Sequence, residues 1–229
     1  MSSRRSFTAL LALLATCAAC SDRHPAGIPA EMDGAARTAS DPAKAPEISI
    51  VFLGDSLTAG SGLARDEAYP DLLGERFTRE GRAVRIVNAG VSGDTSAGGL
   101  ARLSWLLAQA PDVLVVALGA NDGMRGLPVD AMERNLSEIV ARAREAGCRV
   151  LLVGMRVPPN YGENYARAFA AVYPRVAEKH DVPLVPFLLE GVGGVPALNQ
   201  ADGVHPTARG QEKMADTVGK SLAELLHEK

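Results

Sequence analysis

Short apolar runs alternate with amphipathic helical patterns from residue 48 to residue 227, and this alternation constrains the fold more than any other feature. The apolar runs are rich in Val, Ile and Leu, as is typical of parallel strands that are covered on both faces. The predicted strands are Ile48–Leu53, Ala83–Asn88, Asp112–Leu118, Arg149–Met155 and Pro183–Phe187.

Amphipathic helices are predicted in the gaps between these strands, because apolar residues recur there at helical spacing. Strands that alternate with helices imply βαβ crossovers. The predicted fold class is therefore α/β: a three-layer α/β/α sandwich around a five-stranded parallel sheet. The predicted helices are Tyr69–Arg79, Thr95–Gln109, Val129–Ala146, Tyr165–His180 and Ala208–His227.

The N-terminal 46 residues lie outside this pattern. Two arginines precede a short apolar stretch, Phe7–Ala15, and residues 1–19 are predicted to be a signal peptide of the lipoprotein type. Residues 16–21 resemble a bacterial lipoprotein box, which predicts lipidation at Cys20 and a periplasmic, membrane-anchored protein. Ordinary signal cleavage and a soluble periplasmic or secreted protein is the alternative. Residues 20–46, rich in Ala, Pro, Asp and Gly, are predicted to be a flexible tether, which leaves residues 47–229 as the folded domain.

Charge and cysteine content exclude some functions. Removal of residues 1–19 removes two arginines and no acids, so the 24 basic residues become 22 against 27 acidic ones, a formal charge of −5. A nucleic-acid partner is not expected, because binding a phosphate backbone needs a basic surface. Once Cys20 is acylated, Cys148 is left without a partner for a disulfide, and it is predicted to be a small buried hydrophobic residue. Trp105, within a helix, is predicted to serve in packing.

Polar residues that are capable of catalysis follow the predicted strands. In open α/β sheets, function gathers outside the carboxyl ends of the strands. Ser56 follows the first strand, and Asp202 and His205 come from one late loop that follows the fifth. A serine hydroxyl needs a base to take its proton, and a histidine oriented by an aspartate is such a base. Taken one motif at a time, the structural explanations are favoured: a turn serine that caps the following segment, and a solvated turn at Asp202-Gly203.

Four blocks, taken together, resemble the signature of the GDSL/SGNH hydrolase family, and within it the thioesterase I / lysophospholipase L1 / arylesterase branch. The resemblance covers nearly all of residues 48–227, and its specificity comes from four blocks in order. The blocks are Gly54-Asp55-Ser56-Leu57-Thr58-Ala59-Gly60, Asn88-Ala89-Gly90-Val91-Ser92-Gly93-Asp94-Thr95, Gly119-Ala120-Asn121-Asp122-Gly123 and Asp202-Gly203-Val204-His205-Pro206.

The resemblance implies a flavodoxin-like SGNH hydrolase fold and a serine esterase. It assigns Ser56 as nucleophile, His205 as general base and Asp202 as the residue that orients the histidine. The backbone N–H groups of Ser56 and Gly93 and the side-chain amide of Asn121 are the expected oxyanion donors. Substrates are expected to be aryl esters, acyl thioesters or lysophospholipids. Asp55, Asp94 and Asp122 are predicted to be loop and cap residues.

Two further residues are predicted to contact the substrate. Arg156 and Tyr161 are predicted to border the acyl pocket, and the loop Gly123–Pro128 to flank it. No cofactor and no metal are expected, since the sequence contains neither a P-loop, nor a dinucleotide motif, nor metal-ligand spacings. We expect a monomer. An O-acetylesterase that acts on cell-envelope carbohydrate is the alternative enzyme, and a non-catalytic binding protein on a hydrolase scaffold is the remaining one.

Overall fold

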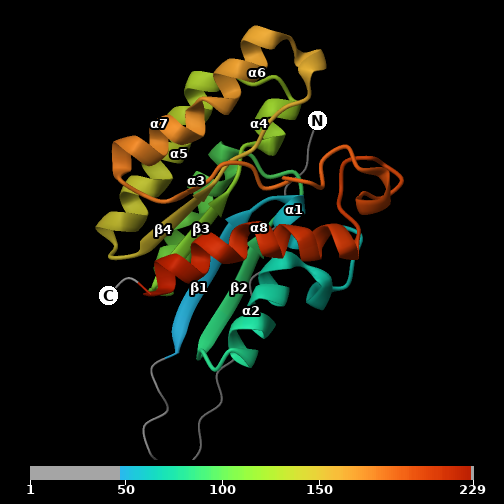
Figure 1. Cartoon of the computed structure of the whole chain (residues 1–229). Helices are drawn as coiled ribbons and strands as arrows, with labels where there is room; N and C mark the ends of the chain where they lie inside the picture. Colours follow the sequence, from blue (N-terminus) through green and yellow to red (C-terminus); the bar gives the residue numbers. More distant parts are fainter. Residues whose placement is uncertain (1–46, 228–229) are drawn as a thin grey trace, which may run out of the picture. The chain divides into compact units, whose positions relative to one another are not determined.

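The structure is a computed structural model that describes residues 47–227 (Figure 1). The predicted signal peptide, the predicted tether and Cys20 lie outside the described residues.

The described residues form a five-stranded parallel sheet with the strand order β2-β1-β3-β4-β5. This is the flavodoxin-like order, and it confirms the predicted fold class. β3 is buried along its whole length, as expected for a central strand with helices on both faces. The strands are β1 (Ile48–Gly54), β2 (Val84–Gly90), β3 (Val113–Ala117), β4 (Arg149–Val153) and β5 (Leu184–Val185).

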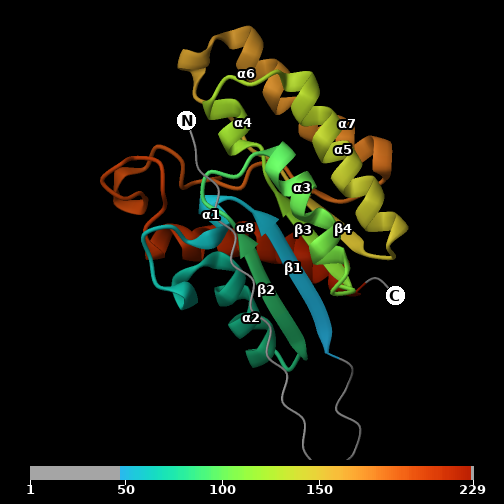
Figure 2. The same ribbon diagram turned by 180° about the vertical axis from the view of Figure 1, so that it is seen from behind.

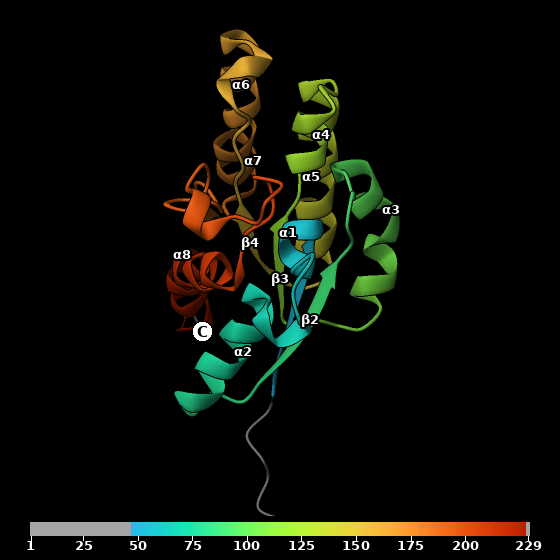
Figure 3. The same ribbon diagram turned by 90° about the vertical axis from the view of Figure 1, so that its right-hand side faces the viewer.

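Helices cover both faces of the sheet. α2 (Tyr69–Arg79) and α8 (Ala208–His227) pack on one face, while α3 (Ser96–Leu107), α5 (Val129–Glu145) and α7 (Val172–His180) pack on the other. Figure 2 shows the second layer from its own side, and Figure 3 shows the sheet between the two layers. Apolar side chains of both layers meet those of the strands in one core, which is the source of most of the stability of such a fold.

The predicted helix Tyr165–His180 is wrong as a single element, because it is two helices, α6 (Glu163–Ala170) and α7. Pro174 explains the break at Ala171, since proline has no N–H to donate to the carbonyl of Ala170 four residues earlier. The fifth strand is also shorter than predicted. Two short helices that the sequence analysis did not predict follow strands: α1 (Ser56–Ala59) after β1 and α4 (Ala120–Met124) after β3.

Two predictions about single side chains have opposite outcomes. Cys148 is buried, with 5% of its surface exposed, and its thiol donates to the carbonyl of Pro111 at 3.1 Å. Burial raises the pKa of this thiol, which keeps it protonated and unreactive. The prediction that Trp105 serves in packing is wrong, because this residue of α3 is 68% exposed.

The strand register brings the carboxyl ends of three strands to one level. Gly54 at the end of β1 pairs with Gly90 of β2 and with Ala117 of β3. The segments that follow these residues therefore emerge side by side, and Figure 1 shows α1, α4 and the loop before α8 at this end of the sheet. Residues 47–227 contain no helix that is both long and apolar enough to cross a membrane.

Candidate active site

Ser56 is the first residue of α1, and the turn from β1 fixes its position. Asp55 caps this short helix, since its carboxylate accepts the N–H of Leu57 at 3.0 Å. Gly54 is required at the strand end, because a Cβ there would stand 2.0 Å from the Thr58 hydroxyl oxygen. Ser56 is half-buried and accessible, whereas Asp55 is 1% exposed.

Asp202 and His205 lie on one tight loop before α8. One carboxylate oxygen of Asp202 accepts the backbone N–H groups of Val204 and His205 at 2.9 and 3.0 Å. The other oxygen lies 2.7 Å from Nδ1 of His205. Gln200 anchors the loop, because its side-chain amide donates to the carbonyls of Ser61 and Pro206. The Asp202 carboxylate therefore binds both the imidazole and the loop backbone that carries it.

A continuous chain of hydrogen bonds joins these three residues. Nε2 of His205 lies 2.9 Å from Oγ of Ser56. An ionised Asp202 only accepts, so the proton of the neutral imidazole lies on Nδ1, and Nε2 is left to accept from the Ser56 hydroxyl. This is the arrangement in which a histidine takes the proton of an attacking serine. The structure thus brings together the three residues that the sequence analysis predicted as catalytic.

Gly93 and Asn121 lie on the two neighbouring segments at this end of the sheet. Gly93 has φ +80°, a left-handed conformation that favours glycine, and follows β2 by three residues. Asn121 belongs to α4, and its amide donates to the carbonyl of Asp94 at 2.9 Å and lies 3.5 Å from the Asp55 carboxylate. Asn121 is thus held beside the segment that carries Gly93. Their action as oxyanion donors stays a prediction.

Two carboxylates at the site have opposite pKa shifts. The hydrogen bond from His205, followed by the backbone N–H groups of His205 and Val204, holds the pKa of Asp202 well below its usual range. Burial is the main cause that raises the pKa of Asp55 to about 6, against the lowering effect of the Leu57 N–H. Asp202 is therefore ionised at neutral pH and suited to pair with an imidazolium, whereas Asp55 holds its charge at a cost.

The two predicted pocket residues, Arg156 and Tyr161, contact other groups than the proposed catalytic side chains. The Tyr161 hydroxyl donates to the carbonyl of Met124 at 2.9 Å, so Tyr161 borders the segment that follows Asn121. The Arg156 guanidinium stacks on Phe187, 4.8 Å from the ring centroid. Tyr165 adds a bond from its hydroxyl to the carbonyl of Leu127. The loop Gly123–Pro128 is therefore tied at two carbonyls, and the substrate contacts of Arg156 and Tyr161 stay predictions.

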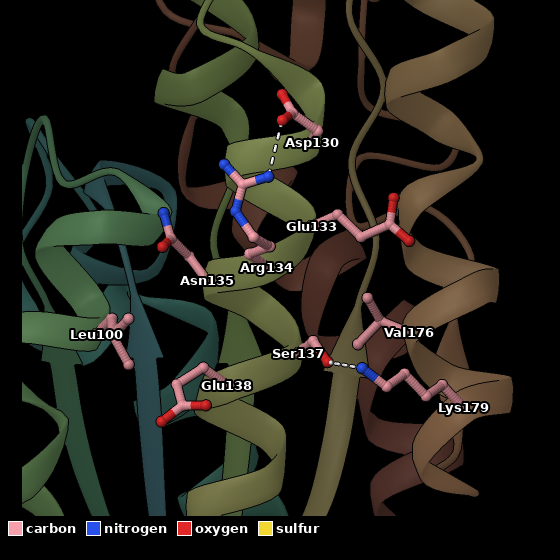
Figure 4. Close-up of a pocket in the computed structure, with 9 residues that line it drawn as sticks. All are labelled: Leu100, Asp130, Glu133, Arg134, Asn135, Ser137, Glu138, Val176 and Lys179. Carbon is pink, nitrogen blue, oxygen red and sulfur yellow. Dashed lines mark hydrogen bonds and ion pairs between the residues drawn. The ribbon is translucent and has the colours of Figure 1, made fainter.

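A separate cavity of about 650 Å³ opens between α3, α5 and α7 (Figure 4). None of the predicted site residues lines it. Most of its charged groups are engaged with neighbours: Asp130 pairs with Arg134 at 2.7 Å, Glu133 pairs with Arg175, and Lys179 donates to Ser137 at 2.9 Å. The hydrogen-bonded chain at Ser56 therefore indicates the reactive site better than the size of a cavity does. Among residues 47–227, no group of three or more His, Cys, Asp or Glu side chains is placed to hold a metal ion.

Arg102 and Gln200 were not predicted to lie at the site, and the burial of Asp55 was not predicted. Arg102 lies on α3 next to the buried Leu103, and it donates to Asp94 and to the carbonyl of Gly54. A charged residue next to the apolar stripe of a helix was the available signal. Gln200 gave no such signal, because its partner Ser61 is 139 residues away in the chain. Asp55 is a cap, as predicted, but a buried one.

Known proteins are similar to this chain in both sequence and fold. The family model described as GDSL-like lipase/acylhydrolase matches residues 52–213. The chain is 46% identical over 179 residues to "Esterase TesA" of Pseudomonas aeruginosa, which covers 78% of this chain and 89% of that protein. It is 41% identical over 180 residues to "Thioesterase 1/protease 1/lysophospholipase L1" of Escherichia coli K12, which covers 78% and 85%.

A solved structure agrees with these relatives. The crystal structure of the psychrotrophic esterase EstA from Pseudoalteromonas, inhibited by monoethylphosphonate, superposes with a TM-score of 0.76 and 34% sequence identity. The match covers 80% of this chain and all of that one. The residues that match the family model, 52–213, include Ser56, Asp202 and His205.

Proposed function

This chain belongs to the GDSL-like lipase/acylhydrolase family, and from that premise we propose that it hydrolyses acyl esters and thioesters through an acyl-enzyme formed on Ser56. Membership of the family, together with relatives named esterase, arylesterase and thioesterase, makes the chain a carboxylic ester hydrolase. The residue roles and the substrate range are the parts that we propose.

The hydrogen-bonded chain from Ser56 through His205 to Asp202 carries the proposal, with distances of 2.9 and 2.7 Å. Oγ of Ser56 attacks the acyl carbonyl carbon while Nε2 of His205 takes the hydroxyl proton. The C–O or C–S bond to the leaving group then breaks, and the imidazolium returns the proton to the departing alcohol or thiol. The acyl group stays on Ser56 as an ester.

Hydrolysis of that ester repeats the same steps with water. His205 takes a proton from the water that attacks the acyl carbon, and the collapse of the intermediate returns the proton to Oγ of Ser56 and releases the acid. In both tetrahedral intermediates, the negative oxygen is bound by the N–H groups of Ser56 and Gly93 and by the amide of Asn121. Each such donor typically contributes about 10²–10³-fold in turnover.

Exposed apolar side chains beside the catalytic groups support an apolar acyl group as the substrate. Each of three segments that bear proposed catalytic residues carries one large exposed hydrophobic residue: Val91 (47%), Met124 (48%) and Val204 (40%). Contact with these side chains would remove apolar surface from water, which favours an apolar acyl group over a polar one. Lysophospholipids, acyl thioesters and aryl esters with acyl chains of medium length are therefore the proposed substrates.

Chain-length preference tests the substrate class. The rate of hydrolysis is measured for p-nitrophenyl esters from acetate to palmitate, with wild type and Ser56→Ala side by side. We expect activity that peaks at medium chains and is lost in Ser56→Ala. A sharp peak at acetate would support the O-acetylesterase instead. Absence of hydrolysis by a folded wild-type protein would support a binding protein on a hydrolase scaffold.

We also propose where the protein acts. Residues 1–19 are proposed as a signal peptide, Cys20 as the lipidated residue and residues 20–46 as a tether to a periplasmic domain, residues 47–229. The charged start, the short apolar stretch and the cysteine after two alanines support this address. The enzyme is proposed to act as a monomer without metal or cofactor, on small acyl substrates, with the membrane reached only through the lipid.

A further inference from the structure

Arg102 on α3 connects two segments that carry the proposed catalytic groups. Its Nε donates to the Asp94 carboxylate at 2.8 Å, and its Nη2 donates to the carbonyl of Gly54 at 3.0 Å. Gly54 lies two residues before Ser56, and Asp94 directly follows Gly93. One guanidinium therefore fixes the end of β1 relative to the segment after β2.

Asp94 extends this connection to a third segment. Its backbone carbonyl accepts the side-chain amide of Asn121 at 2.9 Å, while its carboxylate accepts Arg102. The Asp94 and Arg102 side chains are only 11% and 23% exposed, so solvent screens their ion pair less than it screens a surface pair. The close approach of Asp94 to α3 needs a glycine, since a Cβ on Gly98 would stand 1.8 Å from Oδ1 of Asp94.

We propose that Arg102 is a positioning residue for the oxyanion site, which holds the segments of Ser56, Gly93 and Asn121 at a fixed separation. The proposal rests on the proposed function, because it assumes that these three residues supply the oxyanion donors. Arg102 itself does not touch the substrate. It acts through two groups that accept its hydrogen bonds, the carbonyl of Gly54 and the carboxylate of Asp94. The backbone carbonyl of Asp94 in turn accepts the amide of Asn121, and all three bonds are 3.0 Å or shorter.

The expected consequence is a loss of turnover rather than of substrate binding. Oxyanion donors act on the charge that develops in the transition state, so a shift in their positions lowers kcat and leaves KM nearly unchanged. A misplacement of about 1 Å costs on the order of 10²-fold. Arg102→Ala is expected to lower kcat by about 10–100-fold.

Two further variants separate geometry from charge. Lysine is a single point of charge and lacks the fork of donors that lets Arg102 reach two acceptors from one group. Arg102→Lys is therefore expected to recover part of the lost kcat but not all of it. Asp94→Asn removes the charge that Arg102 binds and keeps the backbone carbonyl for Asn121. Its effect on kcat is expected to be less than additive with that of Arg102→Ala, because both act on one connection.

The test measures kcat and KM on a p-nitrophenyl ester, and the free energy of unfolding in urea, for all these variants. Arg142→Ala is the matched control, since Arg142 also donates to α3, at Ser104 Oγ (2.7 Å), outside the proposed site. Added guanidinium chloride at low millimolar concentration, against equal sodium chloride, tests rescue of Arg102→Ala. We expect a fall in kcat at constant KM, partial rescue, and an unchanged control.

Two outcomes would overturn the proposal. In the first, Arg102→Ala retains kcat within about twofold, or loses it only in proportion to the loss of folded protein, while the wild type is active and Ser56→Ala is not. The proposed function then stands and the role of Arg102 falls. In the second, wild-type turnover does not depend on Ser56, and both proposals fall together.

Discussion

At the scale of single residues, replacement of Asp202 should affect catalysis and leave stability nearly unchanged. The Asp202 side chain is 48% exposed, so the fold depends little on it. Its carboxylate is nevertheless the hydrogen-bond partner of His205 Nδ1, at 2.7 Å. We expect Asp202→Ala to lower kcat on the order of 10²–10⁴-fold, because the imidazole loses the partner that fixes its tautomer. KM and thermal stability should change little.

Asp130→Ala is the control for that variant. Asp130 is an exposed carboxylate that pairs with Arg134 in a helix, and such pairs contribute little to stability. Its loss should leave kcat unchanged in the same ester assay. An Asp202→Ala enzyme as active as Asp130→Ala would show that His205 needs no carboxylate.

Asp55 leads to a prediction about stability and pH. Its pKa is raised from 3.8 to about 6 by burial, so between these pH values the unfolded chain has lost a proton that the folded chain still binds. The contribution of Asp55 to stability therefore falls as pH rises through this window, and the full cost, up to about 3 kcal/mol, is present above pH 6. Asp55→Asn removes this titration and keeps an oxygen for the Leu57 N–H.

Urea unfolding of the wild type and Asp55→Asn at pH 4, 5, 6 and 7 measures this effect. The stability of Asp55→Asn relative to the wild type should increase with pH, whatever constant offset the substitution adds. A difference that stays flat or shrinks as pH rises would mean that Asp55 is ionised at little cost.

Residue types and their order predicted which side chains lie at the site, but not their environments. Ser56, Asp202 and His205 were identified from motifs at strand ends, and the structure brings them into one hydrogen-bonded chain. The burial of Asp55 and the exposure of Trp105 could not be predicted, because both depend on how neighbouring elements pack.

At the scale of elements, β2 and α1 pack so closely that Gly90 is required. A Cβ on Gly90 would lie 2.3 Å from the backbone nitrogen of Ala59 and 2.9 Å from the carbonyl oxygen of Asp55. Both atoms belong to the backbone, so no side-chain rotation relieves the contact. Gly90→Ala is expected to destabilise the protein by about 1–3 kcal/mol or more. Since α1 begins with Ser56, kcat should fall as well.

Gly193→Ala is the matched control for this variant, because its Cβ would meet neighbours at 3.6 Å, an ordinary contact. Thermal unfolding and ester hydrolysis are measured for both variants. Equal stability of the two would show that α1 moves away from β2 without cost.

Element boundaries were predictable where the local sequence decides them. The end of α2 before Gly81 follows the prediction, and Gly81 has φ +79°, which glycine adopts easily. Pro174 in the sequence indicates the break between α6 and α7. The apolar periodicity continues on both sides of it, however, and that periodicity predicts one uninterrupted helix. α1 and α4 are too short to show any periodicity, so no pattern could predict them.

At the scale of the whole molecule, the order of strands and helices was sufficient to predict the layers. Parallel strands need crossover connections, and right-handed crossovers leave few arrangements for five βα units. The conformation of the long loop between β5 and α8 could not be predicted. It depends on individual contacts with residues far away in the sequence, such as the hydrogen bond from Gln200 to the carbonyl of Ser61.

The proposed lipidation and periplasmic location of the protein are tested on the full chain. Expressed in a bacterium that processes lipoproteins, the wild type is expected to incorporate labelled palmitate. Cys20→Ser should lose the label, and Cys17→Ser should keep it. An unlabelled wild type, or a labelled Cys20→Ser, would refute lipidation at Cys20 and favour ordinary signal cleavage.

The most direct test of the central claim is the mapping of the residue that a phosphonate modifies. A p-nitrophenyl alkylphosphonate forms a bond from phosphorus to the serine oxygen and releases p-nitrophenolate, and mass spectrometry of the digested protein locates the adduct. We predict one adduct per chain, on Ser56, at a rate that His205→Ala strongly reduces, and no adduct on Ser56→Ala. An adduct on another residue, or none on a protein that still hydrolyses esters, would contradict the proposed mechanism.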